Sequence, residues 1–216
     1  LTNLTWVDLS WNKISGSLPA EFGNINNIEV INLAWNKLEG TLPSELGNMN
    51  SNGYSELTEF NFANNNLEGT MPSEIAQLSA LRMFDVSFNK LSGSIPQNYT
   101  DWPQLQVLYL QGNSLEGSLP EEIGKLTDLR YLNASSNKIS GTVPPSAGDL
   151  RSLQELHMFE NNFTGAIPRE IGKLYLLRQL RMQDNQLNFN LTKLDTLGNL
   201  VNLVTLDFYN NQMYGD

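Results

Sequence analysis

Residues 1–24 read LTNLTWVDLSWNKISGSLPAEFGN, and residues 25–48 repeat that pattern as INNIEVINLAWNKLEGTLPSELGN. The same 24-residue period continues along the chain and gives nine units, each with an asparagine at the same place. These asparagines are Asn12, Asn36, Asn65, Asn89, Asn113, Asn137, Asn161, Asn185 and Asn211. A fixed period over a whole chain indicates a repeat architecture, in which each unit packs against its neighbours.

A glycine and a proline mark a second part of each unit. The glycine lies four residues after the asparagine in every unit except the eighth, where Phe189 replaces it, and the proline lies three residues further on until Thr192 replaces it. Glycine suits a backbone that bends tightly or needs a positive φ, and proline fixes φ near −65° where no ladder N–H is required. These residues predict a turn across the back of each unit.

The segment before the asparagine predicts a short strand. Val7 and Leu9 flank Asp8 in an apolar-polar-apolar alternation, so Asp8 is expected to face outward. Stacked units make these strands a parallel sheet. An asparagine at the turn off the strand can offer its amide donors and its carbonyl to backbone groups that the bend leaves unpaired, so the asparagine column is predicted to link adjacent coils.

This pattern closely resembles the plant-type class of leucine-rich repeats, LxxLxxLxLxxNxLxGxIPxxLGxL, over essentially all of residues 1–216. The resemblance implies an α/β solenoid: a right-handed superhelix with a parallel β-sheet on its concave face, short second strands, and 3₁₀ turns on the convex side. At roughly 4.8 Å between strands, nine coils would stack to about 40 Å. We expect one domain, 1–216, of about nine repeats. Because neither end carries the cap usual in extracellular members, we expect a fragment of a longer protein.

Two interruptions break the repeat. The third unit begins at Met49 and gains five residues within NSNGYSE, which predicts a surface loop that is either merely tolerated or part of a binding face. The second interruption spans residues 188–198, where apolar residues three apart predict a short helical or 3₁₀ turn on the convex side.

Composition excludes several classes of function. A net charge of −10 opposes an encounter with nucleic acid or an anionic lipid surface, and no run of eighteen apolar residues indicates insertion into a membrane. The chain has no cysteine for disulfides or thiolate metal sites. Its one histidine, His157, has neither a second imidazole nor a serine-glycine elbow beside it. We therefore predict no enzymatic activity, no metal site and no cofactor.

The outward positions of the strands, and those that flank them, predict a binding surface. Aromatic residues are enriched where interfaces derive their energy, because a rigid ring buries much area at a small entropic cost. The alternative is that aromatics just after the strand only pack against their neighbours. The predicted ligand-binding residues are Trp6, Trp11, Trp35, Met83, Phe88, Tyr109, Tyr131, His157 and Phe159.

Five N-x-[ST] sequons occur, a number close to chance for this composition. Asn133 occupies the outward centre of its predicted strand, so a glycan there would cover the middle of the predicted binding surface. The remaining four are candidate N-glycosylation sites: Asn3, Asn98, Asn162 and Asn190.

Three functional hypotheses remain from the sequence. The resemblance implies an extracellular or cell-surface recognition module, receptor-like or inhibitor-like, whose partner is a protein or peptide, with a glycan or matrix component as an alternative partner. A second hypothesis is a structural or adhesive component of the cell surface or matrix. A third is binding of ice or polysaccharide through a column of small hydroxyl residues, namely Ser17, Thr41, Thr70, Ser94, Ser118 and Thr142.

Overall fold

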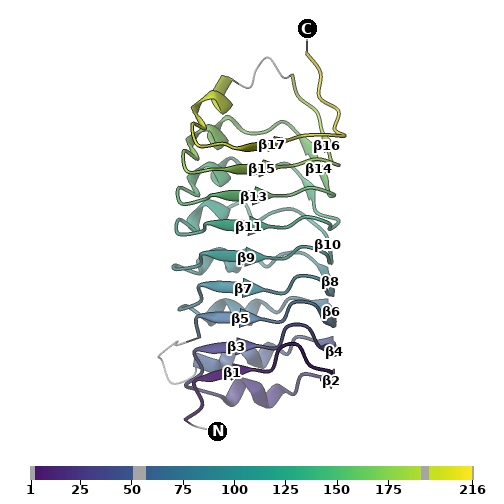
Figure 1. Ribbon diagram of the computed structural model, residues 1–216, viewed down its shortest axis with the longest axis vertical. Coiled ribbons are helices and arrows are strands. Elements are labelled where there is room, and N and C mark those ends of the chain that lie inside the picture. Colours follow the sequence, from purple (N-terminus) through teal and green to yellow (C-terminus); the bar gives the residue numbers. More distant parts are fainter. Residues whose placement is uncertain (1–2, 51–56, 191–194, 216) are drawn as a thin grey trace.

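Nine short parallel strands stack in chain order along the long axis of the molecule (Figure 1). The computed structural model describes residues 3–50, 57–190 and 195–215. The strands are β1 (Trp6–Asp8), β3 (Val30–Asn32), β5 (Glu59–Asn61), β7 (Met83–Asp85), β9 (Val107–Tyr109), β11 (Tyr131–Asn133), β13 (Glu155–His157), β15 (Gln179–Arg181) and β17 (Thr205–Asp207). Each unit adds one strand, so Trp6 pairs with Val30 and Val30 with Glu59. We call the outer surface of this sheet, together with the turns that directly follow its strands, the concave face.

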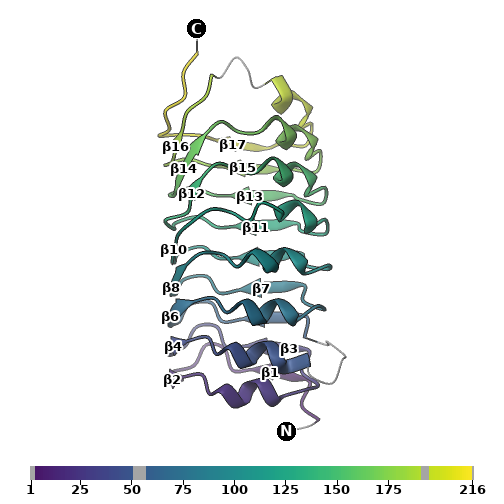
Figure 2. The ribbon, with the colours of Figure 1, turned by 180° about the vertical axis from the view of Figure 1, so that it is seen from behind.

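A second set of short strands runs along one side of the stack (Figure 2). Their five-stranded sheet is formed by β2 (Ser15–Ser17), β4 (Lys37–Thr41), β6 (Asn66–Thr70), β8 (Lys90–Gly93) and β10 (Ser114–Leu115). The next coils continue it with a three-stranded sheet of β12 (Ser140–Gly141), β14 (Asn162–Gly165) and β16 (Gln186–Leu187). The predicted second strands are thus confirmed.

Short 3₁₀ helices close the first eight coils on the convex side, as predicted (Figure 2). They are η1 (Ala20–Asn24), η2 (Ser44–Asn50), η3 (Ser73–Gln77), η4 (Gln97–Asp101), η5 (Ile123–Lys125), η6 (Pro145–Asp149), η7 (Arg169–Lys173) and η9 (Asp195–Asn199). The 3₁₀ turn η9 confirms part of the expectation for the second interruption. Residues 191–194 of that interruption and residues 51–56 of the polar insertion lie outside the described residues.

The core fills the interior of the coils with leucine, isoleucine and a group of aromatic rings. Phe60 and Phe84 stack across adjacent coils with ring centroids 5.1 Å apart, and Tyr99 packs against Trp102 at 4.3 Å. The Tyr99 hydroxyl donates a hydrogen bond to the carbonyl oxygen of Pro72 at 2.9 Å, which satisfies its polar end. The third to fifth coils therefore bury bulky rings where other coils bury smaller apolar side chains.

The asparagine column links the coils as predicted. The Nδ2 of Asn65 donates to the carbonyl oxygens of Phe62 in its own coil (3.1 Å) and of Leu33 in the preceding coil (3.0 Å). Its Oδ1 accepts the N–H of Leu38, also in the preceding coil, at 2.9 Å. One side chain thus satisfies backbone groups that the turn of two coils would otherwise leave unpaired.

Replacing a central member of this column tests its contribution to stability. In Asn113→Leu, the N–H of Leu91 loses its acceptor and the carbonyl oxygens of Val86 and Leu110 lose a donor. The free energy of unfolding should fall by about 1 to 3 kcal/mol, because buried polar groups are left unsatisfied. Denaturant unfolding measures this loss, with Asn66→Leu at an exposed asparagine as the control. A loss no larger than that of the control would contradict the bridging role.

Candidate functional site

The structure places all nine predicted binding residues on the concave face. Four of them project well into solvent, with exposed fractions of 59% for Trp6, 72% for Trp11, 47% for Trp35 and 53% for Phe88. The other five are half-buried: Met83, Tyr109, Tyr131, His157 and Phe159. These four exposed rings lie in coils 1, 2 and 4, whereas a single exposed ring, Tyr209, lies on this face in the later coils, so the amino-terminal half of the face is the more aromatic half.

Trp11 and Trp35 form one aromatic platform. Their ring centroids lie 4.3 Å apart and their planes differ by 7°, so the two indoles are stacked. Both residues have a positive φ, 56° and 58°, and each directly precedes the repeat asparagine of its coil. The N–H of Trp11 donates to the carbonyl oxygen of Ala34 at 3.0 Å. The backbone under the platform is therefore held by hydrogen bonds to the neighbouring coil, and the rings stand where the turn directs them.

The aromatic column is discontinuous beyond this pair. Asn64 occupies the equivalent turn position in the third coil, between Trp35 and Phe88. In the fifth coil this position is Gly112, with φ of 69°, and a Cβ there would lie 2.7 Å from Cδ1 of Phe88. The Phe88 ring thus packs over the backbone of the next coil, separate from the tryptophan platform.

Acidic or amide side chains at the end of the concave strands have a structural role. In six coils, a side-chain oxygen at this position accepts the N–H of the residue two places on, at 2.9 to 3.1 Å. These residues are Asp8, Asn32, Asn61, Asp85, Asn133 and Asp207. The bond closes a local turn that any carboxylate or amide oxygen could close.

Three groups in the middle of the face, one buried and two half-buried, have shifted pKa values. Burial raises the pKa of the Asp85 carboxyl, against the lowering effect of hydrogen bonds from Ser87. Burial also raises the pKa of the Tyr109 hydroxyl, and the charges of Glu155 and Asp85 add to that shift. Burial lowers the pKa of His157 more than the carboxylate of Glu155, 3.9 Å from its Nε2, raises it. His157 is therefore a neutral surface group at pH 7.

The candidate glycosylation sites differ in accessibility. Asn3 and Asn162 are exposed, whereas Asn98 is half-buried and its Nδ2, the atom that would carry a glycan, donates to the carbonyl oxygen of Ser73 at 2.9 Å. Asn190 is half-buried, and its backbone forms an isolated bridge with Tyr214. The structure therefore favours Asn3 and Asn162 as acceptors among the four.

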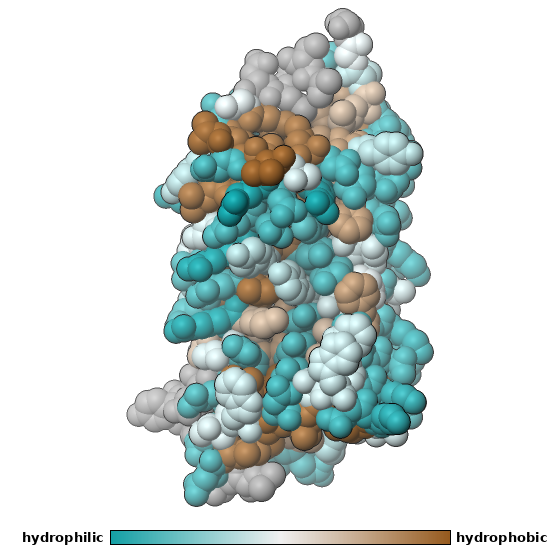
Figure 3. Space-filling model, viewed as in Figure 1, coloured by the Kyte–Doolittle hydropathy of each residue, from teal (hydrophilic) through white to brown (hydrophobic). Residues whose placement is uncertain are grey.

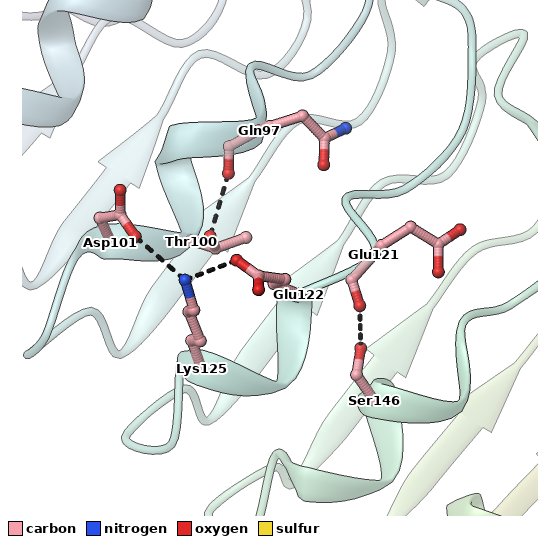
Figure 4. A network of polar contacts seen from close by, with 7 residues as sticks. All are labelled: Gln97, Thr100, Asp101, Glu121, Glu122, Lys125 and Ser146. Carbon is pink, nitrogen blue, oxygen red and sulfur yellow. Dashed lines mark hydrogen bonds and ion pairs between the residues drawn. The ribbon is translucent and has the colours of Figure 1, made fainter.

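Lys125 on the convex side forms one ion pair within its coil and one with the preceding coil. Lys125 on η5 lies between Glu122 of its own turn and Asp101 of η4, 3.6 Å from the latter (Figure 4). In the same view, the Ser146 hydroxyl donates to the carbonyl oxygen of Glu121. These ion pairs are exposed, so each contributes little to stability. The glutamates at this rim lie apart from any histidine and form a solvated surface.

Sequence reasoning missed an apolar patch at the carboxy-terminal end. Figure 3 shows apolar surface gathered there, and its members include Leu176, Val201 and Val204. Val204 is 77% exposed at a position that is Arg178 in the preceding coil and Gln154 in the coil before that. Comparing equivalent positions between coils, rather than reading along the chain, is the signal that finds this patch.

The described residues hold no group of three histidine, aspartate or glutamate side chains placed to bind a metal ion. Within the same residues, every helix is too short or too polar to cross a bilayer.

Comparisons with known proteins agree with this geometry. Residues 64–216 match the family model of the leucine-rich repeat region, and residues 3–25 and 27–49 match that of the leucine-rich repeat. No curated protein matches the chain. Among solved structures, it is similar to the plant peptide hormone receptor RGFR1 in complex with RGF2, with 35% identity and a TM-score of 0.93 over 97% of this chain and 32% of that one.

Two further structures extend the comparison. The ectodomain of the Arabidopsis thaliana membrane receptor kinase GASSHO1/SCHENGEN3, in complex with CASPARIAN STRIP INTEGRITY FACTOR 2, has 32% identity and a TM-score of 0.91 over 98% of this chain and 25% of that one. A plant ice-binding protein has 25% identity and a TM-score of 0.84 over 96% of this chain and 65% of that one. The chain thus spans between a quarter and a third of the two receptor chains.

The raised pKa of Asp85 predicts a pH-dependent stability. The folded state holds the proton of this carboxyl more tightly than the unfolded state does. Protonated Asp85 therefore stabilises the fold fully below the ordinary pKa of 3.8, and this stabilisation is lost as pH rises through the raised pKa. Asp85→Asn keeps an acceptor for Ser87 and removes the buried charge. Its melting temperature at pH 7 should rise, by roughly 2 to 4 °C for each kcal/mol gained.

Thermal melts between pH 3 and pH 8 measure this effect. Asp207→Asn is the matched control, because Asp207 accepts the N–H of Tyr209 in the same way, at 3.0 Å, in the last coil. If Asp85→Asn and the wild type lost stability equally over this range, the carboxyl of Asp85 would not be the source of the pH dependence.

Proposed function

Because this chain belongs to the leucine-rich-repeat family, we propose that it is a recognition module that binds a protein or peptide on its concave face. The proposed setting is extracellular or at the cell surface, and the proposed role is that of a receptor-like or inhibitor-like ligand-binding domain. One similar structure is a peptide hormone receptor in complex with its ligand, and another is the ectodomain of a membrane receptor kinase. The matched family is one of repeat scaffolds rather than of catalysts, and the proposed activity is binding without chemistry.

The observation that carries the proposal is the exposed tryptophan platform of Trp11 and Trp35. Large apolar rings in contact with water indicate an interaction surface, and tryptophan is among the residues that contribute most to binding energy. The stacked geometry and the hydrogen-bonded turn beneath it fix the rings before any ligand arrives. A ligand therefore loses little of its binding energy to the ordering of these side chains.

Peptides selected against the wild-type chain from a random display library provide the test. Trp35→Ala and Trp11→Ala should each weaken binding of the selected peptides by about 2 kcal/mol or more, because each removes one ring of the platform. Alanine at the convex residues Glu45, Glu74 and Glu121 should leave affinity nearly unchanged. The proposal fails if binding survives both tryptophan substitutions and is lost on changing the glutamates.

A second candidate function is ice binding through the five-stranded sheet. Here small hydroxyl residues stand in an exposed row, and each methyl or methylene group packs over the glycine of the next coil, as Thr41 does over Gly69 and Thr70 over Gly93. The row repeats at the spacing of the coils, about 4.8 Å. Similarity to a plant ice-binding protein supports this candidate.

Inhibition of ice recrystallisation separates the two candidates. If the hydroxyl row binds ice, the wild-type chain should keep ice grains small, and Thr41→Tyr or Thr70→Tyr should abolish the effect because a bulky ring disrupts the flat row. Thr127→Tyr, at an exposed threonine after η5, is the control. Large grains with the wild-type chain would rule out this second candidate and leave the first unaffected.

A further inference from the structure

The carboxylate of Asp85 is the most deeply buried charge on the concave face. Asp85 ends β7 near the middle of the sheet and is 8% exposed, and its Oδ1 accepts the N–H of Ser87 at 2.9 Å. At the same position in other coils, Asn32, Asn61 and Asn133 accept the equivalent N–H at 3.1 Å. The turn therefore needs no negative charge at this position, and where the equivalent residue is Tyr109, His157 or Arg181 it forms without this oxygen.

The charge of Asp85 is retained at a cost. Burial raises the pKa of this carboxyl, which means that the folded chain disfavours the charged form. Within the described residues, the ion pairs involve only Lys125 and His157, so no cation lies beside Asp85. Arg82, on the same coil, is directed elsewhere, since its Nη2 donates to Oε1 of Gln104 at 3.4 Å. A buried carboxylate without a counter-ion is destabilising unless a ligand supplies one.

The surroundings of Asp85 suit an organic cation. Tyr109 is its direct partner on the adjacent strand, and the pKa of the Tyr109 hydroxyl is raised in part by the charge of Asp85, so the two groups interact and the phenol stays neutral. Phe88, three residues further along the chain, exposes its ring on the same face. A carboxylate that shares one face with a tyrosine on the adjacent strand and an exposed phenylalanine of its own coil favours a guanidinium or an ammonium group, which the charge and the ring faces both attract.

The charges on the neighbouring coils also favour a cationic ligand. Over coils 1 to 5 the concave face carries four acidic residues and a single basic one, Arg82. The acidic residues are Asp8, Glu29, Glu59 and Asp85. Coils 6 to 9 carry four acidic residues as well, Glu155, Glu160, Asp184 and Asp207, but they also carry the remaining arginines of the face, Arg130, Arg178 and Arg181. The amino-terminal half therefore has the more negative net charge, because it carries fewer arginines, and it has more exposed aromatic rings.

We propose that the amino-terminal half of the concave face binds a basic peptide segment, with one arginine or lysine side chain paired to Asp85 between Phe88 and Tyr109. This inference rests on the proposed function and names the class of its ligand. The rest of the segment runs along the face toward the platform of Trp11 and Trp35. The basic part of the ligand lies over coils 1 to 5, because there the four carboxylates are offset by one arginine, whereas in the later coils four carboxylates are offset by three arginines.

A defined pair of peptides tests this proposal directly. The probe is a nine-residue peptide of alternating glycine and arginine with both ends blocked, and its control carries citrulline, which has the shape of arginine without the charge. Binding is followed by the tryptophan fluorescence of the chain, since three of its four tryptophans, Trp6, Trp11 and Trp35, lie on this half of the face and Trp102 is buried. Calorimetric titration gives the dissociation constants.

The expected result is that the wild-type chain binds the arginine peptide and binds the citrulline peptide much more weakly. Asp85→Asn should weaken binding of the arginine peptide by about tenfold or more, because the paired charge is removed while the hydrogen bond from Ser87 is kept. Asp207→Asn, which keeps the equivalent bond in the last coil, should change the affinity by less than about twofold. Thermal melts confirm that both variants are folded.

Three results would overturn the proposal: no binding of the arginine peptide, equal binding of the two peptides, or equal affinity of Asp85→Asn and the wild type. These outcomes remain separate from the failure of the proposed function. If display-selected peptides require Trp11 and Trp35 but have no excess of basic residues, the concave face is the binding surface and only its proposed preference for cations is wrong.

Discussion

The structure depends on one hydrogen-bonding pattern, in which an asparagine side chain ties each coil to the coil before it. From Asn36 to Asn211, eight asparagines each accept a backbone N–H from the preceding coil and donate to one of its carbonyl oxygens. A coil of about 24 residues has too little interior to be stable alone. Neighbouring coils must supply hydrogen-bond partners for its backbone and bury its apolar side chains. The asparagine does this for the backbone at the turn, where the sheet ends.

The same turn positions the residues proposed to bind. The residue before each bridging asparagine has a positive φ, and in coils 1, 2 and 4 that residue is Trp11, Trp35 or Phe88. A β-turn with this backbone usually favours glycine or asparagine, so a tryptophan there is accommodated at some cost. The bonds that hold the coils in register therefore also hold the rings outward. The turn after each concave strand thus belongs both to the stacking of the coils and to the proposed binding surface.

The repeat was readable from the sequence because its signals are local and recur at one spacing. The strand, the asparagine bridge, the second strand and the 3₁₀ turn all follow from residues within one unit. The details of the concave face are not local. Burial of Asp85, the stacking of Trp11 on Trp35, and the interruption of the aromatic column by Asn64 depend on neighbours in adjacent coils, about 24 residues away. The exposed apolar side chain of Val204 is likewise recognised as unusual only when equivalent positions of successive coils are compared.

Amide hydrogen exchange of the free chain tests most directly whether the asparagine ladder holds the coils in register and so preforms the concave face. The informative amides are those of Leu38, Ile139 and Phe163, which donate to asparagine Oδ1 in the following coil. The account predicts that they exchange as slowly as the amides of the concave strands, because both open only when coils separate. Exchange as fast as that of the exposed turn residues Ser79 and Thr127 would contradict it, since the ladder would then open without the sheet.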